Sequence, residues 1–210
     1  MSLARTYLDF NATSPLRPQA RAAVISALEC AGNPSSVHLE GRWARHILED
    51  ARQAVAALVN AEPRQVIFTS GATEANTTVV GQARWVAVAA AGVEHPSVLE
   101  AARRHGSTFS QLPVDGDGRV CVDALKAWLA APVDGDRLVS LQWANNETGV
   151  LQPVAEVAEL VAEAGGTLHV DGVQAAGRVR IDLNECPISF LTLSSHKIGG
   201  PQGVGAIVQG

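Results

Sequence analysis

An isolated lysine, Lys197, stands shortly after an apolar run and directly before the glycine-rich segment 199–205. Because glycine leaves the main chain uncovered, a ligand can approach the backbone closely beside this lysine. A lysine that is partly shielded from water has a lowered pKa and becomes a usable nucleophile. The segment therefore indicates an amine that bonds covalently to a ligand, although for a lysine taken alone a solvent-facing position is the more ordinary interpretation.

A second group with chemical potential lies in the segment "FTSGATEAN", residues 68–76, where a short β-rich run ends in Ser-Gly and a helix is predicted to begin. Free backbone N–H groups at Ala72 and Thr73 suit a phosphate, because the N-terminus of a helix attracts anions. The segment is neither a Walker A motif nor a G-x-G-x-x-G motif. An ordinary capped turn between a strand and a helix explains it equally well.

Further polar side chains follow predicted strands. Asn146, in "NNETG", could point its amide at a ligand oxygen or could satisfy the backbone of its own turn. Asp171 ends an apolar run, where a carboxylate is costly unless a protonated ring nitrogen or the start of a helix holds it. His95 could stack on an aromatic ring or move a proton, and it could equally be an ordinary histidine at the start of a helix.

The elements that must position these residues alternate along the chain. Helical spacing of apolar residues alternates with short apolar runs typical of buried strands. Alternation of this kind predicts an α/β fold with a mostly parallel, seven-stranded sheet covered by helices on both faces. Ligands in such folds bind beyond the carboxyl ends of the strands. The predicted helices are 17–32, 41–60, 72–82, 96–106, 122–130 and 153–166, and the predicted strands are 65–69, 85–90, 107–114, 137–144, 167–171, 188–194 and 204–209.

Composition excludes several classes of partner. The net charge of −5 and the scattered Lys and Arg residues argue against nucleic acid. The apolar stretch 85–93 is shorter than the ~20 residues of a membrane span, and the N-terminus has no hydrophobic signal region, so we expect a cytoplasmic protein. Cys30, Cys121 and Cys186 have neither disulfide nor metal-site spacing, and we expect no metal.

Taken together, the predicted strand ends offer an amine, a carboxylate, an imidazole, an amide and an anion site. Pyridoxal 5′-phosphate needs this set, because it requires a lysine for its aldehyde, an acid for its ring nitrogen, a stacking group and a phosphate site. The combination therefore indicates this cofactor more strongly than any one residue does.

Seven blocks of the sequence resemble the cysteine desulfurases of the NifS/IscS type, which belong to the class V aminotransferases of fold type I. The blocks are "YLDFNATSP", "GNPSSVH", "FTSGATEAN", "EHPSVL", "NNETGVLQP", "LHVDGVQAAG" and "SSHKIGGPQGVGA", and they run from about Tyr7 to the last residue in the order of the family. Ordered sets of blocks are far more specific than single motifs.

The resemblance implies roles for the site residues. Lys197 is similar to the lysine that binds the cofactor aldehyde, and His95 to the histidine that stacks on its ring and acts as an acid or base. Asp171 would pair with the pyridine nitrogen, and Asn146 and Gln174 would address the phenolic oxygen. The residues expected around the phosphate are Ala72, Thr73, Ser194 and His196.

The resemblance also implies an activity and partners. We expect conversion of L-cysteine to L-alanine, with the sulfur passed as a persulfide to an acceptor protein, in a homodimer. Residues 1–14 would belong to a small domain and 15–210 to the large, cofactor-binding domain of a truncated chain. The nucleophilic cysteine and the arginine that binds the substrate carboxylate would both lie beyond this sequence. A related class V transaminase, a selenocysteine or cysteine-sulfinate lyase, and an inactive remnant remain alternatives.

Overall fold

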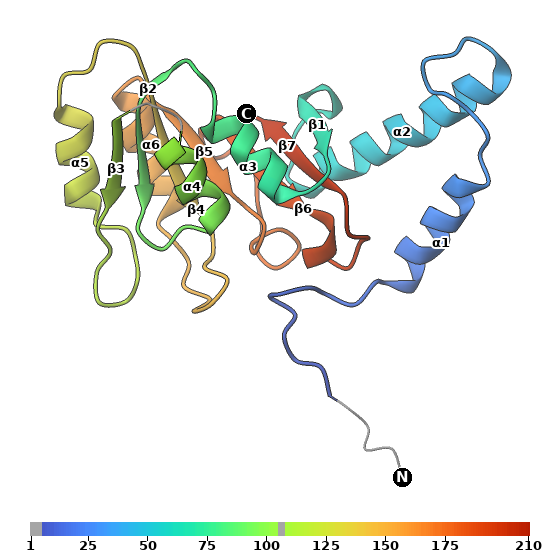
Figure 1. Ribbon diagram of the computed structural model, residues 1–210, viewed down its shortest axis with the longest axis horizontal. Coiled ribbons are helices and arrows are strands. Elements are labelled where there is room, and N and C mark those ends of the chain that lie inside the picture. The colour runs from blue at the N-terminus through green and yellow to red at the C-terminus, as the bar shows by residue number, and fades with distance from the viewer. Residues whose placement is uncertain (1–5, 105–107) are drawn as a thin grey trace.

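A seven-stranded sheet forms the centre of the computed structural model, which describes residues 6–104 and 108–210 (Figure 1). The strand order is β1-β7-β6-β5-β4-β2-β3. Only β7 is antiparallel to its neighbours, β1 and β6, so the predicted α/β fold with a mostly parallel sheet is confirmed. The strands are β1 (Val66–Thr69), β2 (Trp85–Ala91), β3 (Thr108–Leu112), β4 (Asp136–Gln142), β5 (Thr167–Asp171), β6 (Phe190–Ser194) and β7 (Gly205–Gln209).

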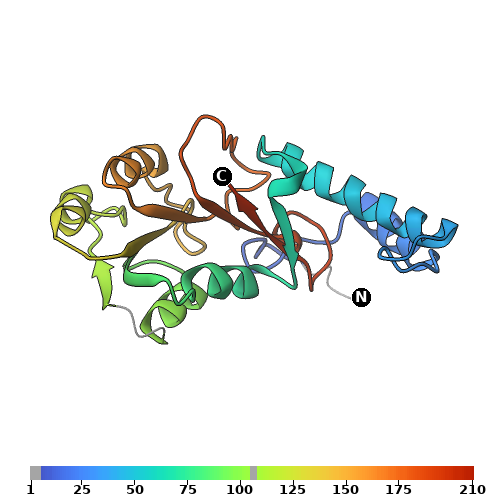
Figure 2. The same ribbon diagram turned by 90° about the horizontal axis from the view of Figure 1, so that it is seen from above.

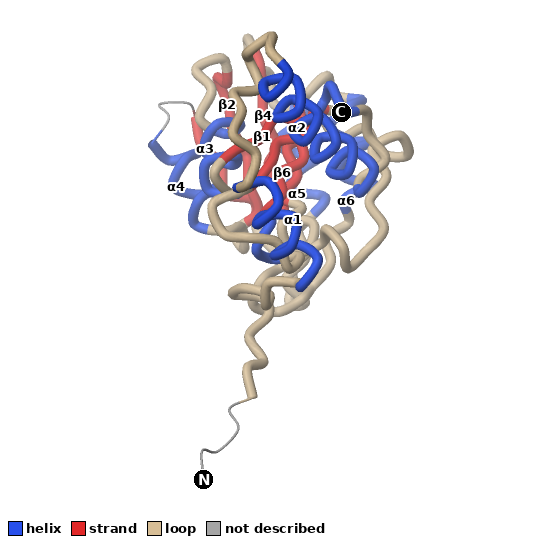
Figure 3. Tube along the Cα trace, turned by 90° about the vertical axis from the view of Figure 1, so that its right-hand side faces the viewer, coloured by secondary structure: helices blue, strands red, loops and turns tan. Residues whose placement is uncertain are grey.

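Helices cover both faces of the sheet, as predicted (Figures 2 and 3). On one face α3 (Ala72–Val80) packs over β6 and β7, and α4 (Pro96–Arg104) packs over β2. On the other face α5 (Val122–Ala130), α6 (Val154–Glu163) and the C-terminal end of α2 (Leu39–Leu58) build the larger apolar core. A sheet buried on both faces needs strands that are apolar throughout, which explains the run "WVAVAAA" in β2.

Several predicted elements end earlier in the structure. Helix α6 stops at Glu163 rather than residue 166, because Gly165 adopts a positive φ of 65° that closes the helix. Strand β4 stops at Gln142 rather than residue 144, because the chain turns into the asparagine-rich loop that follows. The predicted boundary between the helix 96–106 and the strand 107–114 falls partly outside the described residues.

The segment 16–43, here called the N-terminal arm, contains α1 (Pro18–Leu28), a loop and the start of α2, and it extends away from the sheet (Figures 1 and 2). Helix α1 has no buried residue. The arm therefore presents apolar side chains that its own chain leaves uncovered, namely Leu16, Val24, Ile25, Leu28, Val37, Leu39 and Trp43.

Candidate active site

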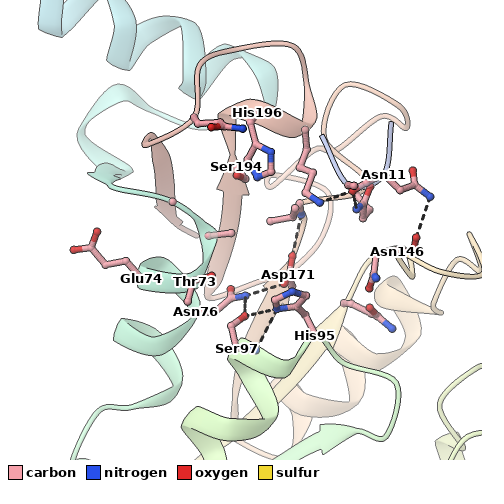
Figure 4. A pocket seen from close by; sticks show the side chains of 18 of the residues that line it. Asn11, Thr73, Glu74, Asn76, His95, Ser97, Asn146, Asp171, Ser194 and His196 are labelled. Carbon is pink, nitrogen blue, oxygen red and sulfur yellow. Dashed lines mark hydrogen bonds between the residues drawn. The ribbon is translucent and has the colours of Figure 1, made fainter. Parts of the chain in front are cut away.

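A cavity of about 540 Å³ lies where the parallel strands end, bounded by the start of α3 and by residues of the N-terminal segment (Figure 4). Every site residue expected from the sequence lines this one cavity. These residues are Ala72, Thr73, His95, Asn146, Asp171, Gln174, Ser194, His196 and Lys197. The structure thus brings together side chains from segments that are more than a hundred residues apart.

Lys197 ends a short 3₁₀ turn, Ser195–Lys197, that follows β6. Its Nζ donates a hydrogen bond to the carbonyl oxygen of Asn11. Partial burial lowers the pKa of Lys197, the nearby Arg178 guanidinium lowers it further, and Asp171 opposes this shift. The amine is therefore held among protein groups at the cavity wall, which favours the reactive interpretation over a solvent-facing lysine.

Asp171 is the last residue of β5, and only 6% of its surface is exposed. One carboxylate oxygen, Oδ1, accepts from the backbone N–H of Val173 at 3.0 Å, and Oδ2 accepts from the Asn76 amide at 2.8 Å. Burial raises the pKa of Asp171, and these hydrogen bonds together with the charges of His95 and Lys197 oppose the rise. A positively charged group beside this carboxylate would stabilise its ionised form.

His95 stands at the start of α4 and lines the cavity. Its Nδ1 lies 3.1 Å from the backbone N–H donor of Ser97 and 2.8 Å from the Ser97 hydroxyl. Because Nδ1 accepts from a backbone N–H, a neutral His95 carries its proton on Nε2. The imidazole is therefore fixed at one nitrogen by its own helix.

The start of α3 provides an anion site. Its N-cap, Gly71, has no side chain to occupy the first N–H groups of the helix. The Glu74 side chain also lines the cavity (Figure 4), and its carboxylate accepts from both the N–H and the hydroxyl of Ser70 at 2.6 Å. The N–H groups of Ala72 and Thr73 are thus left for an anion.

Close packing of two glycines places this turn. A Cβ on Gly205 of β7 would lie only 2.6–2.7 Å from backbone atoms of Gly71, so any larger residue at 205 would displace the start of α3. This contact explains why position 205, in the glycine-rich segment after Lys197, is a glycine: the start of α3 needs the space that a side chain would fill.

Two predicted ligands of a phenolic oxygen are engaged with protein groups. Asn146 Nδ2 donates to the side-chain oxygen Glu147 Oε1 at 2.6 Å, whereas the backbone N–H groups of the turn, at Glu147 and Thr148, donate to Asn145 Oδ1 at 2.9 and 2.8 Å. Gln174 Nε2 donates to the Asn11 carbonyl at 2.9 Å. His196 Nδ1 lies 3.1 Å from the Thr13 hydroxyl, and burial lowers the pKa of this histidine. These side chains line the cavity, and a ligand would have to replace some of their contacts.

Several cavity residues were not predicted from the sequence. Asn76 follows Ala72 by one helical turn and so lies on the same face of α3, a spacing that could have revealed it. Asn11 and Ser97 gave no comparable signal. Within the described ranges 6–104 and 108–210, no group of three or more His, Cys, Asp or Glu residues has the geometry of a metal site. No helix in those ranges is long and apolar enough to cross a membrane.

The sequence matches the aminotransferase class-V family over residues 6–209. The chain belongs to this family. It is 45% identical to a cysteine desulfurase of Cereibacter sphaeroides over 97% of this chain and 54% of the relative. It is 36% identical to an IscS-like cysteine desulfurase of Mycobacterium tuberculosis over 96% of this chain and 54% of the relative. The chain thus spans about half the length of these curated relatives.

Solved structures of class-V aminotransferase relatives share the fold. The NifS-like protein of Rickettsia africae superposes with a TM-score of 0.91 at 32% identity, covering 97% of this chain and 57% of that one. DndA of Streptomyces lividans superposes with a TM-score of 0.80 at 37% identity, covering 97% and 59%. The predicted resemblance to cysteine desulfurases of the NifS/IscS type is confirmed.

Proposed function

We propose that this class-V aminotransferase chain binds pyridoxal 5′-phosphate and forms the cofactor-binding part of a cysteine desulfurase. The observation that carries the proposal is the arrangement of Lys197, Asp171 and the open N-terminus of α3 around one cavity. The donor set suits the cofactor's separate groups: an amine for the aldehyde, a buried carboxylate for the ring nitrogen and helix N–H groups for the phosphate.

When bound, pyridoxal phosphate withdraws electrons from the Cα of an amino acid, which makes the Cα proton acidic. Lys197 would hold the cofactor and, once released from it, would take this proton on Nζ, for which its lowered pKa suits it. Asp171 would stabilise positive charge on the ring nitrogen through its buried carboxylate. His95, fixed through Nδ1, would present Nε2–H at the cavity.

The sulfur chemistry needs a nucleophilic cysteine. Cys30, Cys121 and Cys186 do not belong to the cavity wall that the described residues form. Burial raises the pKa of Cys186, which makes its thiol a poorer nucleophile. The cysteine that forms the persulfide is therefore proposed to lie in the region that the relatives have and this chain does not span. The arginine that binds the substrate carboxylate is proposed to lie in the same region.

A second copy of the chain is the proposed partner of the N-terminal arm. The arm exposes 64% of Trp43 and 80% of Leu28, and apolar surface that is gathered in this way is typical of an interface. We further propose that residues 1–14 belong to a small domain, and that the protein works in the cytoplasm with L-cysteine and a sulfur-acceptor protein.

The test compares wild-type protein with Lys197→Ala and with Lys126→Ala, a lysine of α5 that is not part of the cavity wall. Borohydride reduction followed by peptide mass spectrometry should find pyridoxyl-lysine at position 197 in wild type and Lys126→Ala. Modification at another lysine, with position 197 unmodified, would overturn the proposal. Alanine formed from L-cysteine by the full-length protein, together with sulfide released from the persulfide by an added thiol reductant, then separates a desulfurase from a transaminase.

A further inference from the structure

Asn76 occupies a central place beneath the cavity, because its side chain contacts residues of β5, β6 and α4. The residue is 1% exposed. Its Nδ2 donates to Asp171 Oδ2 at 2.8 Å and to Ser97 Oγ at 3.0 Å, while its Oδ1 accepts from the Thr192 hydroxyl at 2.6 Å. Both N–H groups and the carbonyl oxygen of this buried amide are therefore hydrogen-bonded, and Figure 4 shows the two bonds that it donates, to Asp171 and Ser97.

The direction of these bonds follows from Asp171. An ionised carboxylate can only accept hydrogen bonds, so Asn76 must present its NH₂ group to Asp171 and its carbonyl oxygen to Thr192. Thr192 has one hydroxyl proton, and that proton is used by Asn76. The Thr192 oxygen can therefore only accept from its other neighbour.

That neighbour is His169, which is fully buried. His169 Nε2 lies 3.2 Å from the Thr192 hydroxyl, and Nδ1 lies 2.8 Å from the Ser140 hydroxyl. Nε2 must carry the proton, and Nδ1 must accept from Ser140. Burial lowers the pKa of His169 to about 3, which keeps the imidazole neutral in this tautomer. His169 is thus neither solvated nor isolated, and it belongs to a chain of donors that all point toward Asp171.

We propose that Asn76 is a positioning residue for Asp171, and that the relay from Ser140 through His169 and Thr192 fixes the direction of its amide. The proposal rests on the proposed function only where it assigns Asp171 a role in catalysis. Hydrogen bonds in a buried chain strengthen one another, so the relay stabilises the ionised carboxylate more than an isolated amide would.

The second N–H of the Asn76 amide also sets which group donates and which accepts at Ser97 and His95. Ser97 Oγ accepts from Asn76, so its own proton is free to be donated to His95 Nδ1. The other titratable groups that act on Asp171 are His95 and Lys197, and Asp171 in turn raises the pKa of the buried Glu94. These groups stay in place in every variant below.

The experiment uses the full-length protein freed of cofactor, with ¹³C-labelled aspartate and ¹⁵N-labelled histidine, observed by NMR across a pH series. In Asn76→Ala the pKa of Asp171 should rise by about one pH unit, since a hydrogen bond to a charged group is lost. Thr78→Ala, an exposed change on the same helix, is the control and should leave Asp171 unchanged.

A second pair of variants keeps the test decisive should Asn76→Ala fail to fold. Thr192→Val removes the hydroxyl at nearly constant volume, so His169 should lose the Nε2–H tautomer in favour of Nδ1–H, donated to Ser140. The pKa of Asp171 should rise as well. Thr192→Ser retains the hydroxyl and should restore both the tautomer and the pKa.

An unchanged Asp171 pKa in both Asn76→Ala and Thr192→Val would overturn the proposal, as would an Nδ1–H tautomer of His169 in the wild-type protein. None of these readouts requires bound cofactor. Their failure would therefore leave the pyridoxyl-lysine test of Lys197 intact, and a failure of that test would leave the relay measurable.

Discussion

The carboxyl edge of the sheet and the N-terminal arm differ in which side chains they bury. The sheet edge buries polar side chains, and the arm exposes apolar ones. At the sheet edge, Asn76, Asp171 and His169 are buried; Asn76 donates directly to Asp171, and His169 is linked to Asn76 through the Thr192 hydroxyl. In the arm, Trp43 and Leu28 are exposed, and no element among residues 6–104 and 108–210 covers them. Burying polar groups is costly unless they are paired, and exposing clustered apolar groups is costly unless a partner covers them.

The two regions differ in whether the described residues supply the contacts that their side chains need. At the sheet edge the buried side chains of Asn76, Thr192 and His169 are already paired with one another among the described residues, whereas Glu94 Oε2 has no partner there. In the arm, the apolar side chains of Leu28, Val37 and Trp43 are exposed in the part of the chain that the structure describes, and a second copy is their proposed partner. Substitutions in the two regions should therefore affect different measurable quantities.

The largest effect is expected for Asp171→Asn at the sheet edge. The variant should retain cofactor but should lose about 10²–10³-fold in the rate of alanine formation, because the buried negative charge no longer stabilises the ring nitrogen. Steady-state alanine assays with full-length protein and a cofactor absorbance spectrum measure both properties. A rate within threefold of wild type would show that this carboxylate is not part of the chemistry.

His169 should make the sheet edge sensitive to acid. The pKa of His169 is lowered from 6.5 to about 3 by burial, so its contribution to stability is complete above pH 6.5 and is lost as the pH falls toward 3. The loss should reach about 1.4 kcal/mol per pH unit in that window. Urea unfolding at several pH values measures the free energy of unfolding. Between pH 7 and pH 4 this free energy should fall less steeply with pH in His169→Gln than in wild type. His46→Gln, an exposed change on α2, should retain the wild-type slope.

The arm should respond in association rather than in chemistry. Trp43→Ser should raise the dissociation constant of a homodimer by about 30-fold, the effect of losing an aromatic anchor worth ~2 kcal/mol. Light scattering at several concentrations measures this constant. Val86→Ser, which removes an exposed apolar side chain from the sheet body, is the matched control. Equal dissociation constants for the two variants would contradict the assignment of the arm to the interface.

The smallest effect is expected at Glu94, whose Oε1 accepts from the Gln142 N–H at 2.8 Å while its buried Oε2 has no hydrogen-bond partner among the described residues. Burial raises the pKa of Glu94 well above 4.5, so its contribution to stability is present below pH 4.5 and is lost as the pH rises through the folded-state pKa. Glu94→Gln should therefore raise Tm by about 2–4 °C at pH 8 and change it little at pH 4.5. A larger gain at pH 4.5 than at pH 8 would reverse this sign.

Much of the fold could be predicted from the sequence, because buried parallel strands are apolar throughout and helices between them are punctuated by glycine. The run "WVAVAAA" and the pair Gly165–Gly166 carry such signals. The order of the strands and the antiparallel direction of β7 depend on contacts between distant segments, which no local pattern encodes.

The residues of the candidate site also form two groups, those that the sequence pattern identified and those that only the structure revealed. Residues at strand ends, such as Asp171 and Lys197, could be named from the sequence because a polar residue after an apolar run is informative. The Asn76 network could not, because its members lie inside α3, β4, β5 and β6 and acquire meaning only when those elements are packed together. His169 stands in the middle of the short run 167–171, and its full burial within this network became evident only from the structure.

Strand β7 has a consequence for the geometry of the active site. It returns antiparallel beside β6, which leads into the Lys197 turn, and it also pairs with β1, which leads into the start of α3. Backbone hydrogen bonds therefore set the separation between the reactive amine and the anion-binding turn. Protein with and without a bound anion should therefore share this spacing, whereas the flanking segments of Asn11 and Asn146 meet through a single side-chain hydrogen bond, from Asn11 Nδ2 to the Asn146 carbonyl oxygen at 3.0 Å.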